Sequence, residues 1–118
     1  MKLLVVEDNA SFRRLIGDVL SAISPEVFEC SDGVHVLNAY EVHRPDVVLM
    51  DIAMPVMDGI EATRAIRDEV PGTRIVVVTG SAATDDVSRA RSAGASGYVT
   101  KDQIAGDLVR AILDAAAA

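Results

Sequence analysis

The chain has 118 residues, half of them hydrophobic and a quarter charged, and a formal net charge of −7. This length suits one hydrophobic core, and the composition is too apolar for a disordered chain, so we expect a single domain over residues 1–118. The negative charge disfavours direct binding to nucleic acid and to anionic membrane surfaces, which both require basic patches. The lone cysteine, Cys30, excludes an internal disulfide framework and a multi-thiolate metal site.

The sequence carries no sign of a membrane span. Its longest apolar runs, such as 3–6 and 75–78, are far shorter than the roughly 20 residues that cross a bilayer. The N-terminus enters a strand-like run at once, without the basic and apolar segments of a secretion signal. We therefore expect a cytoplasmic protein whose partners are other proteins or cations.

Segments with two hydrophobic patterns alternate along the chain. Short apolar runs rich in β-branched residues predict strands, and apolar residues spaced three and four apart predict helices. In chain order the patterns predict strand 3–6, helix 12–23, strand 27–30, helix 34–42, strand 47–50, helix 60–66, strand 75–78, helix 84–93, strand 98–100 and helix 104–115. Three strands are apolar throughout, as in strands buried on both faces, whereas 27–30 and 98–100 are mixed and predict sheet edges.

The predicted helices differ in the strength of their apolar faces. Helix 84–93 presents only Val87, Ala90 and Ala93 among charged residues, so we expect it to be weakly anchored. The first and last helices have long apolar faces, formed by Phe12, Leu15, Ile16, Val19, Leu20 and Ile23, and by Ile104, Leu108, Ala111, Ile112 and Ala115.

Strictly alternating strands and helices predict a (βα)5 fold of the α/β class. Because crossovers between parallel strands are right-handed, the helices should cover both faces of a doubly wound, five-stranded parallel sheet. The expected strand order is the flavodoxin-like 2-1-3-4-5. In such a sheet, ligands bind beyond the carboxyl ends of the strands, where the strand order reverses.

Polar residues follow the apolar runs at four of these strand ends. They are Glu7 and Asp8 after the first strand, Asp51 after the third, Thr79 and Ser81 after the fourth, and Lys101 after the fifth. Three carboxylates at adjacent strand ends would repel one another and raise some pKa values unless a cation lies between them. Oxygen ligands of this kind suit Mg²⁺, which takes one or two carboxylates together with phosphate oxygens and water. The sequence therefore indicates a site for magnesium and a phosphoryl group.

Lys101 and Thr79 fit the same site. Lys101 can place a positive charge on a phosphoryl oxygen or on Asp51, and the Thr79 hydroxyl can donate to another phosphoryl oxygen. One carboxylate remains free to act as a nucleophile and form an aspartyl phosphate. Taken alone, each residue has an ordinary interpretation: Asp8 with Asn9 as a helix cap, Asp51 as a loop acid, Thr79 as a strand residue and Lys101 as a surface lysine. Their joint occurrence at strand ends that converge favours the phosphoryl site.

Four local sequences, at residues 5–9, 48–62, 77–80 and 97–101, resemble those of the response-regulator receiver family. The resemblance covers essentially the whole chain. It implies that Asp51 accepts a phosphoryl group from a histidine kinase or a phosphotransfer protein.

The resemblance also implies roles for the other polar residues of the strand ends. Asp8 and Asp51, with the backbone carbonyl of Ala53, would bind Mg²⁺, and Glu7 would act through water. Thr79 and Lys101 would hold the phosphoryl group.

Tyr98 would be the switch aromatic that responds to Thr79. The surface that changes on phosphorylation would be formed by helix 84–93, strand 98–100 and helix 104–115. It would bind an output domain or a second copy of the chain in a homodimer. The downstream output would be a process such as transcription.

Two positions depart from the family pattern. Lys101 is followed by Asp102, where relatives commonly have proline in a cis peptide, so the bond is expected to be trans or unusually strained. The Lys101–Asp102 pair looks more like receivers of the NarL/LuxR type, which precede DNA-binding output domains. Ala53 replaces a larger polar residue and cannot position or exclude a hydrolytic water.

Other functions of the same fold are less well supported by the sequence. A phosphatase of the haloacid dehalogenase type requires a second aspartate two residues after the nucleophile, where this chain has Ala53. A flavin or nucleotide module would have a glycine-rich phosphate loop after the first strand, which is absent. A pseudo-receiver that only binds partners would not need the acid, threonine and lysine set.

Overall fold

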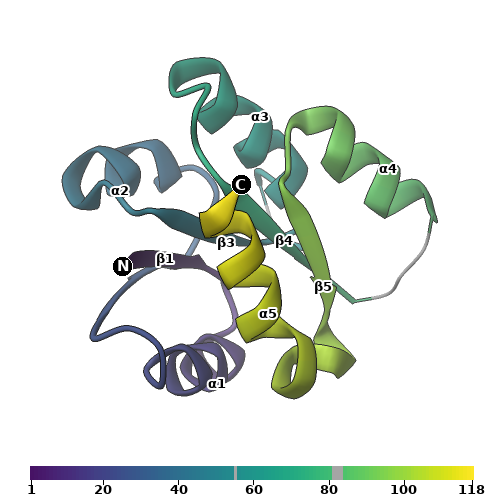
Figure 1. Cartoon of the computed structure of the whole chain (residues 1–118). Coiled ribbons are helices and arrows are strands. Elements are labelled where there is room, and N and C mark those ends of the chain that lie inside the picture. Colours follow the sequence, from purple (N-terminus) through teal and green to yellow (C-terminus); the bar gives the residue numbers. More distant parts are fainter. Residues whose placement is uncertain (55, 81–83) are drawn as a thin grey trace.

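Strands and helices alternate from one end of the chain to the other (Figure 1). The computed structural model describes residues 1–54, 56–80 and 84–118, with only the backbone of Thr84; Pro55 and Ser81, which belong to the sequence patterns above, lie outside this part. The elements are β1 Lys2–Val6, α1 Ala10–Leu20, β2 Glu26–Cys30, α2 Val36–His43, β3 Val47–Asp51, α3 Gly59–Glu69, β4 Ile75–Thr79, α4 Thr84–Ala93, β5 Gly97–Thr100, a short 3-10 helix Lys101–Gln103 and α5 Ile104–Ala117.

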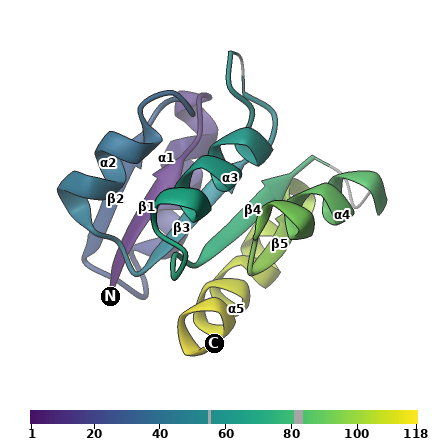
Figure 2. The same ribbon diagram turned by 90° about the horizontal axis from the view of Figure 1, so that it is seen from above.

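The strands form one parallel sheet in the order β2-β1-β3-β4-β5, as the sequence predicts. Helices α1 and α5 cover one face of the sheet, and α2, α3 and α4 cover the other (Figure 2). Strand order therefore reverses between β1 and β3, because the chain leaves β1 for β2 on one side and returns to β3 on the other. The carboxyl ends of these two strands are where a ligand site is expected.

The sheet separates two hydrophobic cores. Successive residues of a strand point to opposite faces, so that Leu3 and Val5 of β1 pack under α1 and α5, whereas Leu4 and Val6 pack under α2, α3 and α4. Strands β1, β3 and β4 are buried on both faces, which explains their continuous apolar sequences. Strands β2 and β5 are the two edges, and both are only partly buried, as predicted.

Two helix predictions need correction. Helix α1 ends at Leu20, so Ile23 belongs to the following turn, and Leu15 is 50% exposed although its spacing assigned it to the apolar face. Helix α2 begins at Val36, and Val34 lies before it and is half exposed. Apolar periodicity indicates which face of a helix is buried, but it cannot show which turns of the helix extend past the edge of the sheet.

The buried contacts of α4 are small. Ala90 and Ala93 are buried and Val87 is half-buried, and the helix packs beside α3 and β5. Methyl groups bury little apolar surface, which agrees with the expectation of weak anchoring; the mobility of α4 stays a prediction. Among the described helices, none combines the length and hydropathy needed to span a bilayer.

Candidate functional site

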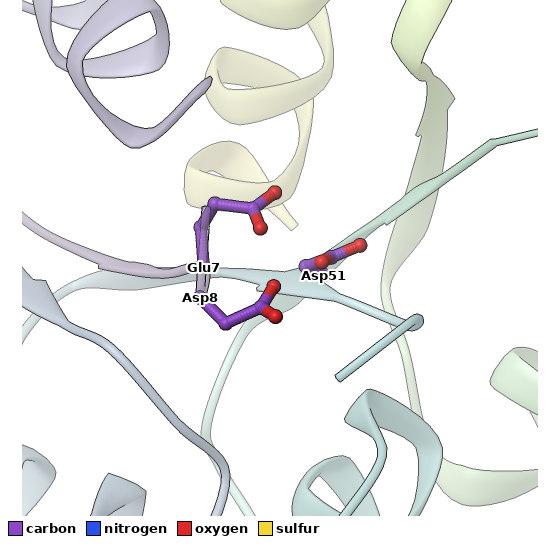
Figure 3. A group of neighbouring side chains, drawn as sticks. All are labelled: Glu7, Asp8 and Asp51. Atoms are coloured by element: carbon purple, nitrogen blue, oxygen red, sulfur yellow. The ribbon is translucent and has the colours of Figure 1, made fainter. Parts of the chain in front are cut away.

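Three carboxyl groups come together at the carboxyl ends of β1 and β3. Glu7 and Asp8 directly follow β1, and Asp51 is the last residue of β3, which pairs with β1 up to Val6 and Met50. One oxygen of each carboxyl group lies within 4.8 Å of the other two. Figure 3 shows Glu7 and Asp8 leaving the chain on opposite sides, with Asp51 beside them. The structure thus brings together the acidic residues that the sequence placed at neighbouring strand ends.

Burial divides the three acids. Glu7 and Asp51 are fully buried, whereas Asp8 is exposed. Glu7 Oε2 accepts a hydrogen bond from the Asn9 amide at 3.1 Å, and Asp51 Oδ1 accepts one from the Ala53 amide at 3.3 Å. Within the described part of the chain, Glu7 Oε1 and Asp51 Oδ2 are buried and have no hydrogen-bond partner. Such oxygens are costly to bury unless a ligand or cation completes them.

The pKa of Glu7 reflects this crowding. The pKa is raised from an ordinary 4.5 to about 7: burial is the largest cause, the neighbouring carboxyl groups of Asp51 and Asp8 also raise it, and the hydrogen bond from the Asn9 amide opposes the rise. Near neutral pH, Glu7 is therefore protonated in a substantial fraction of molecules, which lowers the repulsion within the cluster.

Lys101 supplies a positive charge to the two buried acids. It follows β5 directly and opens the 3-10 helix, and its Nζ lies 3.5 Å from Asp51 Oδ1 and 3.6 Å from Glu7 Oε1. The contact with Asp51 agrees with the predicted pairing, whereas the contact with Glu7 was not expected. All described peptide bonds are trans, so the bond between Lys101 and Asp102 takes the first of its two expected forms.

Thr79 and Tyr98 lie on the next two strands of the sheet. Thr79 ends β4, is buried, and lies opposite Thr100 of β5, directly before Lys101. Tyr98 is 38% exposed and lines a cavity of about 270 Å³ between β5, α4 and α5. Tyr98 is therefore outside the carboxylate cluster, as its predicted role as a separate switch residue requires.

The loop after Asp51 is fastened where it returns to the sheet. The Gly59 amide donates to the Ile52 carbonyl at 2.9 Å, and Asp58 caps α3 by accepting from the Glu61 amide at 2.8 Å. A Cβ at position 59 would lie 2.7 Å from the carbonyl carbon of Asp51. Glycine is therefore needed at this position for the helix to approach the end of β3 so closely.

Helix α1 begins with a side-chain cap that belongs to Asn9. Asn9 Oδ1 accepts from the Phe12 amide at 2.9 Å, which leaves the Asp8 side chain to the carboxylate cluster. The ordinary interpretation of Asp8 as a helix cap is therefore unnecessary.

Two residues of α1 reach the site without having been predicted to do so. Arg13 donates from Nη1 to the Glu7 carbonyl at 2.8 Å and forms an ion pair with Glu29 at 3.0 Å. Phe12 places its ring under the ammonium of Lys101, with Nζ 4.8 Å from the ring centroid. Helical spacing assigned Phe12 to the core and gave no signal for Arg13, because contacts between different elements leave no local pattern.

Comparison with known proteins identifies the family. Residues 3–113 match the sequence profile of the response regulator receiver domain. The chain belongs to this family. Receiver domains are signalling modules of two-component systems, and phosphorylation-dependent switching is general to them.

Individual relatives of this receiver domain agree with the assignment. It is 36% identical over 100 residues to the chemotaxis protein CheY of Halobacterium salinarum, covering 85% of this chain and 83% of that protein. It is 38% identical over 112 residues to the transcriptional regulatory protein PdtaR of Mycobacterium tuberculosis, covering 94% of this chain but 54% of PdtaR. A two-component response regulator of the LuxR family from Aurantimonas superposes with a TM-score of 0.92 at 32% identity, covering 98% of this chain and 84% of that chain.

The residues present in this receiver domain fit the divalent cation that the family binds through acidic side chains. Two buried carboxylate oxygens have no hydrogen-bond partner among the described residues, and Asp8, the third member of the cluster, is exposed. The donors are all oxygens, as Mg²⁺ prefers. Burial and the neighbouring carboxyl groups raise the pKa of Glu7, and a bound cation would oppose that rise.

Proposed function

We propose that this receiver domain accepts a phosphoryl group on Asp51 from a histidine kinase or a phosphotransfer protein. The observation that carries the proposal is the environment of Asp51. Its Oδ2 is buried and has no hydrogen-bond partner in residues 1–54, 56–80 and 84–118, its Oδ1 faces the ammonium of Lys101 at 3.5 Å, and two further carboxyl groups lie within reach of a shared cation. A carboxylate held in this way is positioned as a nucleophile, and most of the catalysis consists of positioning and charge neutralisation.

The proposed reaction forms a bond between a carboxylate oxygen of Asp51 and phosphorus, and breaks the bond from phosphorus to the donor's imidazole nitrogen. The imidazole leaves with the bonding electrons and is protonated. Lys101 balances negative charge on the phosphoryl oxygens, and the Thr79 hydroxyl donates to one of them. Asp8, Asp51 and the Ala53 carbonyl would hold Mg²⁺, with Glu7 acting through water, and the metal would neutralise charge on the carboxylates and the phosphoryl group.

The same chemistry supports a switch and not a turnover enzyme. The phosphoryl group would be released by autodephosphorylation, in which water attacks phosphorus. The small Ala53 side chain can neither position this water nor exclude it. The proposed response is a movement of Thr79 toward the phosphoryl group, followed by Tyr98. The face of α4, β5 and α5 would then bind an output domain or a second copy of the chain, because the fully buried side chains of α4, among those described, are the small Ala90 and Ala93.

Length and charge complete the proposal. We take residues 1–118 as one receiver domain, and since the chain spans about half of PdtaR, control of transcription would belong to a partner or an attached output domain. With a net charge of −7, this domain itself is not expected to bind nucleic acid.

The proposal is tested by intact mass spectrometry after incubation with acetyl phosphate, with and without Mg²⁺. We expect one added phosphoryl group in wild-type protein only when Mg²⁺ is present, and none in Asp51→Asn. Asp58→Asn is the matched control, because asparagine preserves the α3 cap while making the same chemical change seven positions along the chain. Equal labelling of wild type and Asp51→Asn would reject Asp51 as the acceptor.

A further inference from the structure

The ammonium of Lys101 has an aromatic neighbour besides the two buried acids. Nζ lies 4.8 Å from the centroid of the Phe12 ring, which is within the range of a cation–π contact. Its distances to Asp51 Oδ1 and Glu7 Oε1 are 3.5 and 3.6 Å, suitable for an ion pair but long for a hydrogen bond. The charge is therefore shared between two carboxyl groups and a ring face.

The surroundings leave Lys101 room to move. A cavity of about 400 Å³ opens beside it, lined by Asn9, Ser11, Phe12, Leu15 and Lys101 itself. The side chain of Lys101 is 34% exposed, and lysine has a flexible stem that loses considerable rotamer entropy when it is fixed. Among the residues lining this cavity, Phe12 contacts the ammonium through the face of its ring.

Phe12 is itself well fixed. Its amide donates to Asn9 Oδ1 in the cap of α1, and its ring packs against the core under α1 and α5. The ring is therefore a rigid surface, set by the first turn of a capped helix, against which a flexible side chain can rest.

We propose that Phe12 is a positioning residue, which holds the Lys101 ammonium in place for the phosphoryl group by a cation–π contact. The proposal rests on the proposed function of Asp51 and Lys101. It adds that the position of this ammonium is set by α1 as well as by the acids, so that part of its ordering is complete before the phosphoryl group arrives.

The test compares Phe12→Leu, which keeps an apolar side chain but removes the ring face, with Phe12→Tyr, which keeps the ring. Leu15→Ala is the control, because Leu15 lines the same cavity and is half exposed. The first measurement is the NMR shift of the Lys101 ε-protons in magnesium-free protein. We expect an upfield ring-current shift in wild type, Phe12→Tyr and Leu15→Ala, and its loss in Phe12→Leu.

The second measurement is the affinity for fluoroberyllate, a phosphoryl mimic, in the presence of Mg²⁺. We expect Phe12→Leu to bind about two- to fivefold more weakly, from the usual strength of a partly exposed cation–π contact, and the other two variants to bind as wild type does. Unshifted Lys101 ε-protons in wild type, or equal or tighter binding by Phe12→Leu, would overturn the role of Phe12. Failure of wild type itself to bind fluoroberyllate would instead reject the proposed function, while the magnesium-free NMR result would still decide the contact.

Discussion

Gly59→Ala should destabilise the fold at the point where the acceptor loop meets the sheet. Its new Cβ would lie 2.7 Å from the Asp51 carbonyl carbon and 2.8 Å from Ile52 Cα, whereas unbonded carbons stay roughly 3.5 Å apart or more. The Asp51 carbonyl oxygen would lie closer still to the new Cβ, so the start of α3 or the end of β3 must shift by about 1 Å or more, and both are backbone, which cannot rotate aside. Overpacking costs roughly 1–3 kcal/mol, and we expect the upper half of that range.

Gly17→Ala is the matched control, since it makes the same chemical change inside α1. A Cβ there would meet no atom of the described residues within 4 Å, and alanine stabilises a helix interior by about 0.5–1 kcal/mol relative to glycine. Urea denaturation followed by circular dichroism should therefore separate the two variants by about 3 kcal/mol in the free energy of unfolding. Phosphoryl uptake should slow in Gly59→Ala and stay unchanged in Gly17→Ala. If Gly59→Ala proved as stable as Gly17→Ala, the close approach of α3 to Asp51 would not constrain this loop.

Three further outcomes are expected. Val56 is a β-branched residue with a φ of 69° and 93% exposure, so Val56→Asn should raise the free energy of unfolding by about 0.5–1 kcal/mol, because asparagine tolerates the left-handed region; a loss in urea denaturation would contradict this. The folded-state pKa of Glu7, about 7 against an ordinary 4.5, means that its contribution to stability is complete below pH 4.5 and is lost as pH rises through 7. In magnesium-free buffer, wild type should thus lose up to about 3 kcal/mol relative to Glu7→Gln between pH 4.5 and 8, and parallel urea-derived profiles would refute it. Lys101→Ala should make thermal stability depend more strongly on Mg²⁺, because the buried acids lose their counter-charge; an equal Mg²⁺ response in wild type would exclude that role.

The sequence predicted the sheet well because the interior strands have a clear physical signature. Residues 3–6, 47–50 and 75–78 are apolar on both faces, and only a strand covered by helices on both sides needs that. Right-handed crossovers then leave few ways to arrange five strands. The extent of α1 was less predictable, because the exposure of Leu15 depends on how far the helix overhangs its neighbours.

The sequence predicts which acidic residues lie together in the site, but not which of them are buried or what they contact. Glu7, Asp8 and Asp51 were placed together by the strand ends alone. Whether Glu7 or Asp8 is buried depends on the face of the sheet toward which each side chain points. Glu7 continues the alternation of residues 3 and 5, toward α1 and α5, and packs beside Lys101. The contacts of Lys101 with Phe12 and Glu7 join residues about ninety positions apart, at a distance that no local pattern can register.

The two hydrophobic cores give the molecule a degree of mutational independence. A substitution that enlarges or empties one core is felt first by side chains of the same layer, since the strand backbones stand between the two. Phe12 packs against the layer of α1 and α5, whereas Ala90 of α4 belongs to the other. The sequences of α1 and α5 can therefore change during evolution without requiring changes in α4, and the reverse also holds. Homologues with this fold can therefore acquire new binding surfaces around α4 while the core beneath Phe12 keeps the same packing.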